Sequence, residues 1–234
     1  MKIAYSFYSL KDLSALSNGE RLLEILLSYG LDIEKVDDRE PIRKDFITTN
    51  LSEMWKDDGI EGGCSSCYFL FKGKKKIKFS GIVKWDVNLH PNCKTFNGIH
   101  LWLDIPKKYS INELVLLGDD IFVWSEAVYG YITEDSKDNN MGGDVYEGIP
   151  GLVWVNYFGI PYKAESEFHI LGDHKSVGHG VRLMLSETPN DEMLSDSNFV
   201  ESIKNKIGAE WFWSYPRKYN RKKPTFDRTA ITKR

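Results

Sequence analysis

The alternation of hydrophobic and polar positions predicts antiparallel strands in the first half of the chain. Residues 77–89 alternate most clearly, and with 68–71 they flank a lysine- and glycine-containing turn at 72–76, which indicates a hairpin. Residues 99–105 repeat the pattern. One face of this sheet is therefore expected to be apolar and the other wet. On the wet side of the 99–105 strand lie His100, Trp102 and Asp104.

Helical spacing predicts three longer helices. One covers 18–29 and ends at Gly30, and another covers 111–128 after a capping signal at Ser110–Glu113, with Gly130 as its stop. The last covers 196–207. Shorter elements are expected at 2–8, 51–55, 131–133, 168–171 and 181–185.

The stretch 151–159 predicts a strand buried on both faces. Its apolar side chains fall on both sides, with Trp154 and Phe158 on one side and Tyr157 on the other. Asn156 is the polar exception. Because an unpaired buried amide is costly, we expect its side chain to bond neighbouring backbone.

Hairpins and helices follow one another without a strict βαβ repeat. This order favours an α+β fold, a mostly antiparallel β-sheet with helices packed on it, over a doubly wound parallel sheet. We predict one domain over 1–215 and a basic C-terminal tail over 216–234.

Composition changes this picture little. The chain has 234 residues, 41% hydrophobic and 28% charged, which is typical of a globular protein. Its net charge of −3 argues against direct nucleic-acid binding. No run of about 20 apolar residues predicts a membrane span, and the N-terminus lacks a signal-peptide pattern. An odd number of cysteines favours a reducing compartment, so we expect a cytoplasmic protein.

Four residues have spacing that could hold a structural zinc. They are Cys64, Cys67, His90 and Cys93, and they flank the hairpin. Free cysteines in glycine-rich turns are the commoner outcome, so we expect no metal and keep zinc as the alternative.

Catalytic motifs are missing from the sequence. It contains no nucleophile elbow, phosphate loop, dinucleotide fingerprint or zincin helix. His169, His174 and His179 recur at intervals that fit neither one helix face nor one strand face. We therefore expect a protein that is not an enzyme and has no cofactor.

Charge is distributed unevenly along the chain. Residues 119–147 hold eight acids and one base, whereas 214–234 hold eight bases and one acid. The plain interpretation is two solvated surfaces that attract one another. The functional interpretation is an acidic surface that docks a basic partner.

The order of motifs resembles bacterial immunity proteins of polymorphic-toxin systems, of the immunity protein 52 type or a close relative. The resemblance rests on 150–159 (Pro-Gly-Leu-Val-Trp-Val-Asn-Tyr-Phe-Gly), on 161–162 and 183–189, and on the late helix before Trp211 and Phe212. It covers most of the chain, and its motifs are structural.

This resemblance implies a non-enzymatic cytoplasmic protein that binds a cognate protein toxin and neutralises it by occlusion. Toxins that are nucleases have basic active-site surfaces, which would suit the acidic stretch. The expected contacts are Asp119, Asp120, Glu134, Asp135, Asp138, Asp144, Glu147 and the aromatic anchor Trp102. The alternatives are a metal-dependent hydrolase that uses the cysteine–histidine set, or a structural or regulatory binding module without a toxin partner.

Overall fold

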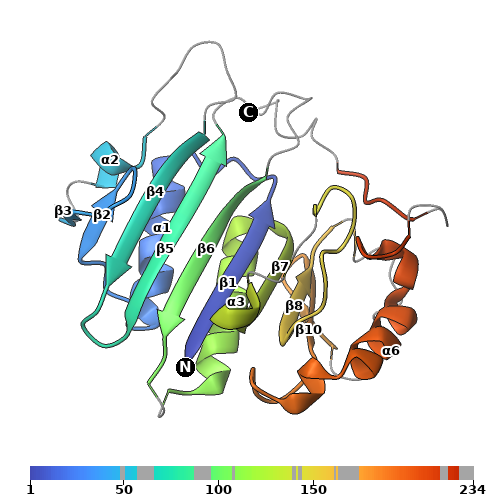
Figure 1. Cartoon of the computed structure of the whole chain (residues 1–234). Helices are drawn as coiled ribbons and strands as arrows, with labels where there is room; N and C mark the ends of the chain where they lie inside the picture. Colours follow the sequence, from blue (N-terminus) through green and yellow to red (C-terminus); the bar gives the residue numbers. More distant parts are fainter. Residues whose placement is uncertain are drawn as a thin grey trace.

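The structure is a computed structural model that describes residues 1–47, 51–56, 66–86, 96–106, 109–138, 141, 144–160, 162, 174–216 and 221–226. Its strands form one ten-stranded sheet in the order β3-β2-β4-β5-β6-β1-β7-β8-β10-β9, and every named pair is antiparallel. Helices pack on this sheet (Figure 1). The predicted α+β class is confirmed.

The elements have the following bounds. The strands are β1 (Lys2–Ser9), β2 (Lys35–Asp37), β3 (Lys44–Asp45), β4 (Ser66–Gly73), β5 (Lys78–Asp86), β6 (Asn97–Asp104), β7 (Ala127–Glu134), β8 (Val155–Phe158), β9 (His174–Val177) and β10 (Gly180–Met184). The helices are α1 (Leu16–Ser28), α2 (Leu51–Met54), α3 (Ile111–Ser125), α4 (Asp135–Asp138) and α6 (Ser197–Ile207), with 3-10 turns η3 (Glu192–Ser195) and η4 (Ala209–Trp211).

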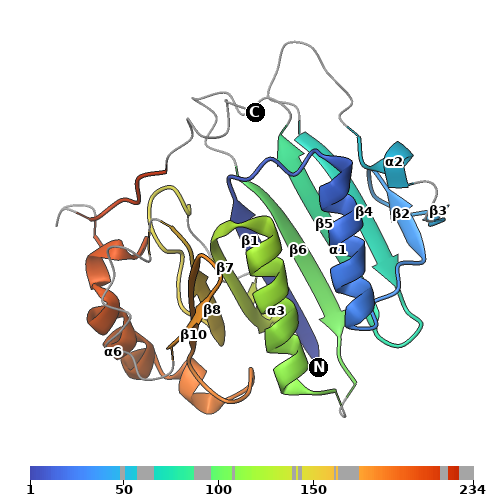
Figure 2. The same cartoon turned by 180° about the vertical axis from the view of Figure 1, so that it is seen from behind.

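One face of the sheet is covered by α1 and α3, which lie side by side (Figure 2). Their apolar stripes meet the inward side chains of the strands, and Tyr5 of β1 and Leu117 of α3 are both buried in the main core. The Tyr5 hydroxyl also donates to the carbonyl oxygen of Leu114 at 3.0 Å. This contact fixes the position of α3 over the middle of the sheet.

The opposite face is covered over the half formed by β7, β8 and β10. There a second apolar cluster joins Phe158 and Leu183 of the sheet to Ile207 of α6 and to Trp211. The C-terminal segment 221–226 packs on the same half, because the Phe226 ring meets the rings of Phe96, Tyr146 and Tyr162 at centroid distances of 5.3, 5.3 and 6.3 Å. No described helix covers the half formed by β4, β5 and β6 (Figure 1).

Helix α3 ends sooner than the hydrophobic spacing predicted. It stops at Ser125, and Glu126 adopts the left-handed conformation with φ of 49°. Val128 and Gly130, predicted in and just after the helix, belong to β7 instead, where Gly130 pairs with Phe7 and Tyr157. The apolar spacing continued past the turn because β7 is itself buried.

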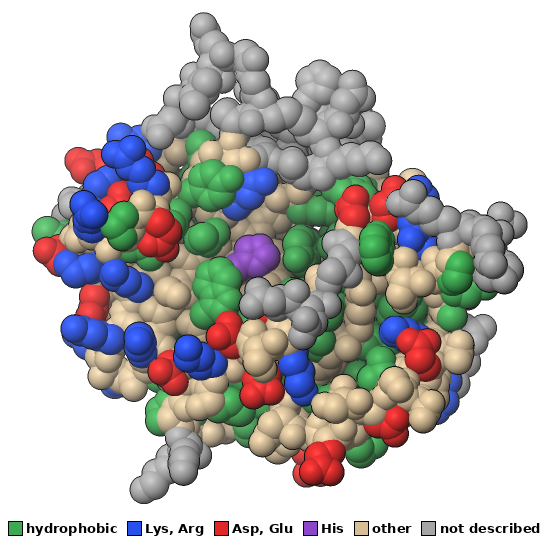
Figure 3. Space-filling model, viewed as in Figure 1, with side chains coloured by type: hydrophobic (Ala, Val, Ile, Leu, Met, Phe, Trp, Pro, Cys, Tyr) green, Lys and Arg blue, Asp and Glu red, His purple; other side chains and the backbone are tan. Residues whose placement is uncertain are grey.

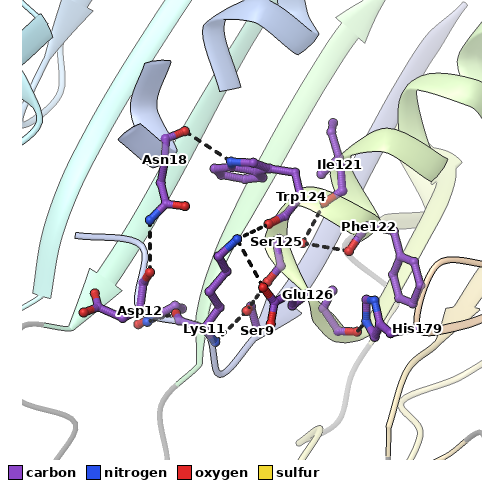
Figure 4. A network of polar contacts seen from close by, with 12 residues as sticks. Ser9, Lys11, Asp12, Asn18, Ile121, Phe122, Trp124, Ser125, Glu126 and His179 are labelled. Atoms are coloured by element: carbon purple, nitrogen blue, oxygen red, sulfur yellow. Dashed lines mark hydrogen bonds and ion pairs between the residues drawn. The ribbon is translucent and has the colours of Figure 1, made fainter. Parts of the chain in front are cut away.

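A polar network holds this end of α3 in place (Figure 4). Lys11 donates from Nζ to the carbonyl oxygen of Trp124 at 2.8 Å and pairs with Glu126 at 3.3 Å. A cation at a helix C-terminus is favourable. His179 hydrogen-bonds the carbonyl oxygen of Ala127 through Nε2 at 2.8 Å. The network ties the β1–α1 connection and the β9–β10 turn to one helix end.

The stretch 151–159 is shorter as a strand than predicted. Only Val155–Phe158 form β8, an interior strand that is fully buried on both faces, as expected. Trp154 precedes the strand and joins the helix-side core together with Tyr157, rather than sharing the side of Phe158. The chain bends before β8, so strand alternation does not extend back to Trp154.

The side chain of Asn156 makes the local bonds that were predicted. Its Oδ1 accepts from the backbone N–H of Val153 at 3.0 Å, and its Nδ2 donates to the carbonyl oxygen of Val153 at 2.7 Å. Both partners are backbone groups of Val153, so the Asn156 side chain stabilises the bend that precedes β8.

Candidate functional site

The half of the sheet that no described helix covers is the candidate site, and we call it the open face. Strand alternation sets which side chains it presents, because Ile99 and Leu101 of β6 and Phe79 of β5 point into the main core. Their neighbours point outward. The open face thus presents Lys72 of β4, Lys78, Ser80, Ile82 and Lys84 of β5, Gly98, His100, Trp102 and Asp104 of β6, and Lys2, Ala4, Ser6 and Tyr8 of β1.

Trp102 is the largest side chain on the open face. Its register partners are Ala4 on β1 and Ser80 on β5. Both partners have small side chains, which cover little of the indole, and Trp102 is half-buried. The wet-side position predicted for Trp102 therefore holds, and neither α1 nor α3 lies over it.

His100 precedes Trp102 on β6 and points to the same side of the sheet. The two rings stack at a centroid distance of 6.2 Å, and the Tyr8 ring meets the imidazole edge-on at 5.8 Å. Ser6 Oγ is 2.9 Å from His100 Nδ1. Burial lowers the pKa of His100; the negative charge of Asp138 opposes this shift, and the positive charge of Lys84 adds to it. Neutral imidazole is the form favoured at neutral pH.

An aromatic ridge continues from His100 toward the covered half. Tyr8 contacts Phe96 edge-on at 6.1 Å and stacks near Tyr129 at 6.2 Å. The Tyr131 hydroxyl donates to Asp138 of α4 at 2.9 Å, and α4 lies against β1 and β7. Helix α4 therefore forms the border between the open and covered halves.

A groove of about 690 Å³ adjoins Trp102, and we call it the Trp102 groove. Asp135 of α4 also lines it, so two of the predicted contact residues share one cavity. Lysines from four strands and the β4–β5 turn surround it. The full lining is Lys2, Glu34, Lys35, Glu40, Ile42, Lys72, Gly73, Lys74, Lys78, Phe79, Ser80, Trp102, Leu103, Asp104 and Asp135.

The other predicted acids are dispersed over the molecule. Asp119 is buried, bridged to Arg182 at 2.5 Å, and accepts from the Tyr157 hydroxyl at 3.0 Å. Burial, followed by the charge of Asp119, raises the pKa of Tyr157. Asp120 accepts from the Tyr29 hydroxyl at 2.7 Å, which places it on the helix-covered side.

The remaining acids have separate surroundings. Glu134 falls on the helix-covered side, because it alternates with Ile132 of the main core along β7. Asp144 is exposed and accepts from the backbone N–H of Tyr146 at 2.9 Å. Glu147 is held at 2.8 Å by both Arg221 and Lys223. At Glu147 the acidic stretch does pair with the basic C-terminal segment.

The cysteine–histidine set falls mostly outside the described residues. Cys64, His90 and Cys93 are not described, and Cys67 lies half-buried on β4. Within the described ranges, no group of three or more His, Cys, Asp or Glu side chains is arranged to hold a metal ion.

An open sheet face with a prominent tryptophan, flanking aromatics and exposed lysines is suited to binding another macromolecule. Tryptophan and tyrosine are the side chains most often dominant at protein interfaces. The sequence pointed to Trp102 and His100 through their alternation. It contained no signal for the ridge of Tyr8 and Phe96, because those residues meet only through strand register.

Comparison with known proteins supports the fold. No protein-family model matches the chain, and no curated protein matches its sequence. Among solved structures it is similar to "Pseudomonas aeruginosa T6SS protein PA0821", with a TM-score of 0.59 and 12% identity. The match covers 90% of this chain and 76% of that one. The likeness shows a shared fold.

The helices were also compared with the requirements of a bilayer. Across the described ranges, none has the length and apolar character to cross a membrane.

Proposed function

We propose that this chain is an immunity protein that binds a cognate secreted toxin and neutralises it by occlusion. The observation that carries the proposal is the open face, where Trp102 and His100 lie half-buried on the sheet and no described helix covers them. Occlusion requires a preformed surface, and a sheet backed by two helices changes shape little on binding.

Two further observations support the proposal. The motifs of 150–159 and 183–189 resemble those of immunity proteins. The fold is shared with a protein whose name assigns it to the type VI secretion system. We propose a cytoplasmic location, because an odd number of cysteines favours a reducing compartment. We also propose no catalytic activity, because the sequence contains no recognised catalytic motif.

The competing candidate is a hydrolase that uses the cysteine–histidine set. Metal analysis of the purified chain separates the two candidates. A stoichiometric zinc lost on replacing Cys67 and Cys93 with serine would favour the hydrolase.

The experiment that tests the proposal is co-expression. The probe is the variable C-terminal domain of the secreted protein encoded beside this chain's gene. Expressed alone, that domain should arrest growth, and the chain should restore growth and co-purify with it. Restored growth without co-purification, or no protection at all, would contradict the proposal.

A further inference from the structure

We infer that the toxin also docks in a second groove, on the outer side of α1, and that the segment it places there is basic and carries apolar side chains. The inference rests on the proposed function and extends the interface beyond the open face. The second groove has a volume of about 770 Å³ and lies between α1, the β2–β3 region and α2. We call it the α1 groove.

Helix α1 is apolar on two faces. Its inward face is buried in the main core. Leu16, Leu23 and Leu27 line the α1 groove instead, at spacings of seven and four residues, which place them on one face of the helix. Leu16 is 38% exposed and Leu27 57% exposed. Exposed apolar side chains that gather in one groove indicate an interaction site, whereas scattered ones do not.

The charged lining of the α1 groove is mostly acidic. It consists of five acids and one base, which are Glu20, Glu24, Asp32, Glu34, Asp45 and Lys75. Three of the acids have a cation beside them, namely Arg21 at Glu24, Lys75 at Asp32 and Lys35 at Asp45. Even with Arg21 and Lys35 counted in, five acids stand against three bases. Glu20 and Glu34 form no ion pair with a described residue.

The Trp102 groove, in contrast, does not select a partner by its charge. Acids and lysines both line it, and both signs are mixed over the β2, β4 and β5 side of the open face (Figure 3). Glu34 lines both grooves, so the two adjoin. A partner anchored at Trp102 therefore reaches the α1 groove, where the excess of carboxylates favours lysine and arginine side chains.

A second copy of this chain is another protein that could cover the leucines. A symmetric dimer formed through the α1 groove would bring two acid-lined surfaces together, and like charges across an interface are costly. Nucleic acid would be repelled by the same carboxylates. We therefore assign the α1 groove to a basic, apolar segment of the toxin.

The charge of the groove is tested with two double variants of equal net charge. Glu20→Lys/Glu24→Lys reverses charge in the α1 groove, and Glu192→Lys/Glu201→Lys reverses it on η3 and α6. The two pairs match, because all four side chains are exposed and Glu24 and Glu201 each form an ion pair with a residue three positions away. The probe is the toxin domain used for co-expression, and association and dissociation rates are measured at low and high salt. Circular dichroism confirms that each variant is folded.

The inference predicts that the groove variant associates ~10-fold or more slowly at low salt, with a smaller difference at high salt, because charge reversal at an interface acts mainly on the association rate. The control variant should stay within about 2-fold of wild type. Unchanged or faster association of the groove variant, or equal slowing of both variants, would overturn the inference and leave the immunity proposal intact. Failure of the wild-type chain to bind would instead overturn the immunity proposal.

The apolar part of the groove is tested with Leu27→Gln. Its control is Leu116→Gln on α3, an exposed leucine that does not line the groove. Leu27→Gln should raise Kd for the toxin domain ~5-fold or more, mainly through faster dissociation, and Leu116→Gln should stay within about 2-fold of wild type. Similar values of Kd for the two variants would contradict the inference.

Light scattering of the isolated chain distinguishes the toxin from a second copy as the occupant. The chain should be a monomer. A dimer that dissociates in Leu27→Gln would assign the α1 groove to a second copy of this chain and overturn the inference.

Discussion

At the scale of single residues, Asn156 shows how a buried amide can serve structure alone. Both of its hydrogen bonds go to the backbone of Val153, and the side chain is fully buried. Its place in a motif rich in aromatics would otherwise suggest recognition. The amide instead shapes the bend before β8, which is separated by β1 and β7 from the β6 strand that carries Trp102.

Replacing Asn156 with leucine should therefore lower the free energy of unfolding. The change leaves the N–H and C=O of Val153 unpaired in the core, at a cost of about 2–4 kcal/mol. Urea denaturation measures it, and Asn205→Leu on the exposed side of α6 is the control, with a change under about 0.5 kcal/mol. Equal stabilities for the two variants would contradict this role.

His100 predicts a pH dependence of stability. Burial lowers its pKa in the folded chain below the ordinary value of 6.5, so the unfolded chain binds this proton first. The stability due to neutral His100 is complete above the unfolded pKa and is lost as pH falls through 6.5 toward the folded pKa.

The free energy of unfolding should thus decrease between about pH 7.5 and about pH 5.5, before most carboxylates titrate. In His100→Gln that decrease should be smaller. Asp138 and Lys84, which face His100 with opposite charges, should be retained in both proteins. An identical pH profile for the variant would show that His100 is not the titrating group.

At the scale of elements, the turn from α3 to β7 depends on one left-handed residue. Glu126 adopts φ of 49°, a conformation that costs a non-glycine residue about 1–2 kcal/mol. Its ion pair with Lys11 is 63% exposed on the Glu126 side and offsets little of that cost.

Glu126→Gly should consequently raise stability by about 0.5–1 kcal/mol, since glycine removes the strain but adds freedom to the unfolded chain. Glu126→Gln deletes the charge and keeps the strain, so it should give no gain. Thermal unfolding followed by circular dichroism compares the two. A glycine variant less stable than the glutamine variant would refute the argument.

The C-terminal segment 221–226 is a packed element of the described structure. Arg221 is 4% exposed and Glu147 16% exposed, so their pair is mostly buried. Phe226 adds an aromatic contact with Tyr146 on the same side.

Breaking this pair should destabilise the chain. Glu147→Gln leaves a buried guanidinium without its counter-charge, and we expect a loss of about 2–3 kcal/mol, below the full buried-pair value because Lys223 is exposed. Glu201→Gln breaks the pair with Lys204, in which the Glu201 side chain is 58% exposed, and should cost under about 0.5 kcal/mol. Chemical denaturation of both variants measures the difference, and similar losses would contradict it.

At the scale of the whole molecule, local pattern was enough to predict the hairpin of β4 and β5, the helices α1 and α6 and the α+β class. It failed where two elements are buried in succession, as at the end of α3, because apolar spacing does not mark a turn between them. It also could not show that Asp119 meets Arg182 or that Glu147 meets Arg221, since these pairs join residues far apart in the chain.

The position of the candidate site could likewise not be predicted from the local sequence pattern alone. Alternation put Trp102 on the polar side of its strand, but whether a helix covers that side depends on how the whole chain folds. In the structure, α1 and α3 share one face, and the C-terminal elements cover half of the other. The partial exposure of Trp102 is thus a property of the fold.

The most direct test of the account is the affinity of the toxin domain for three forms of the chain: wild type, Trp102→Ala and Trp213→Ala. Trp213 is 40% exposed and lies outside the open face, so it matches Trp102 in chemistry but not in place. The account predicts that Trp102→Ala raises Kd by ~30-fold or more, as loss of an interface anchor does, while Trp213→Ala stays within about 3-fold of wild type. Unchanged affinity of Trp102→Ala, or an equal loss in both variants, would contradict the assignment of the open face as the binding surface.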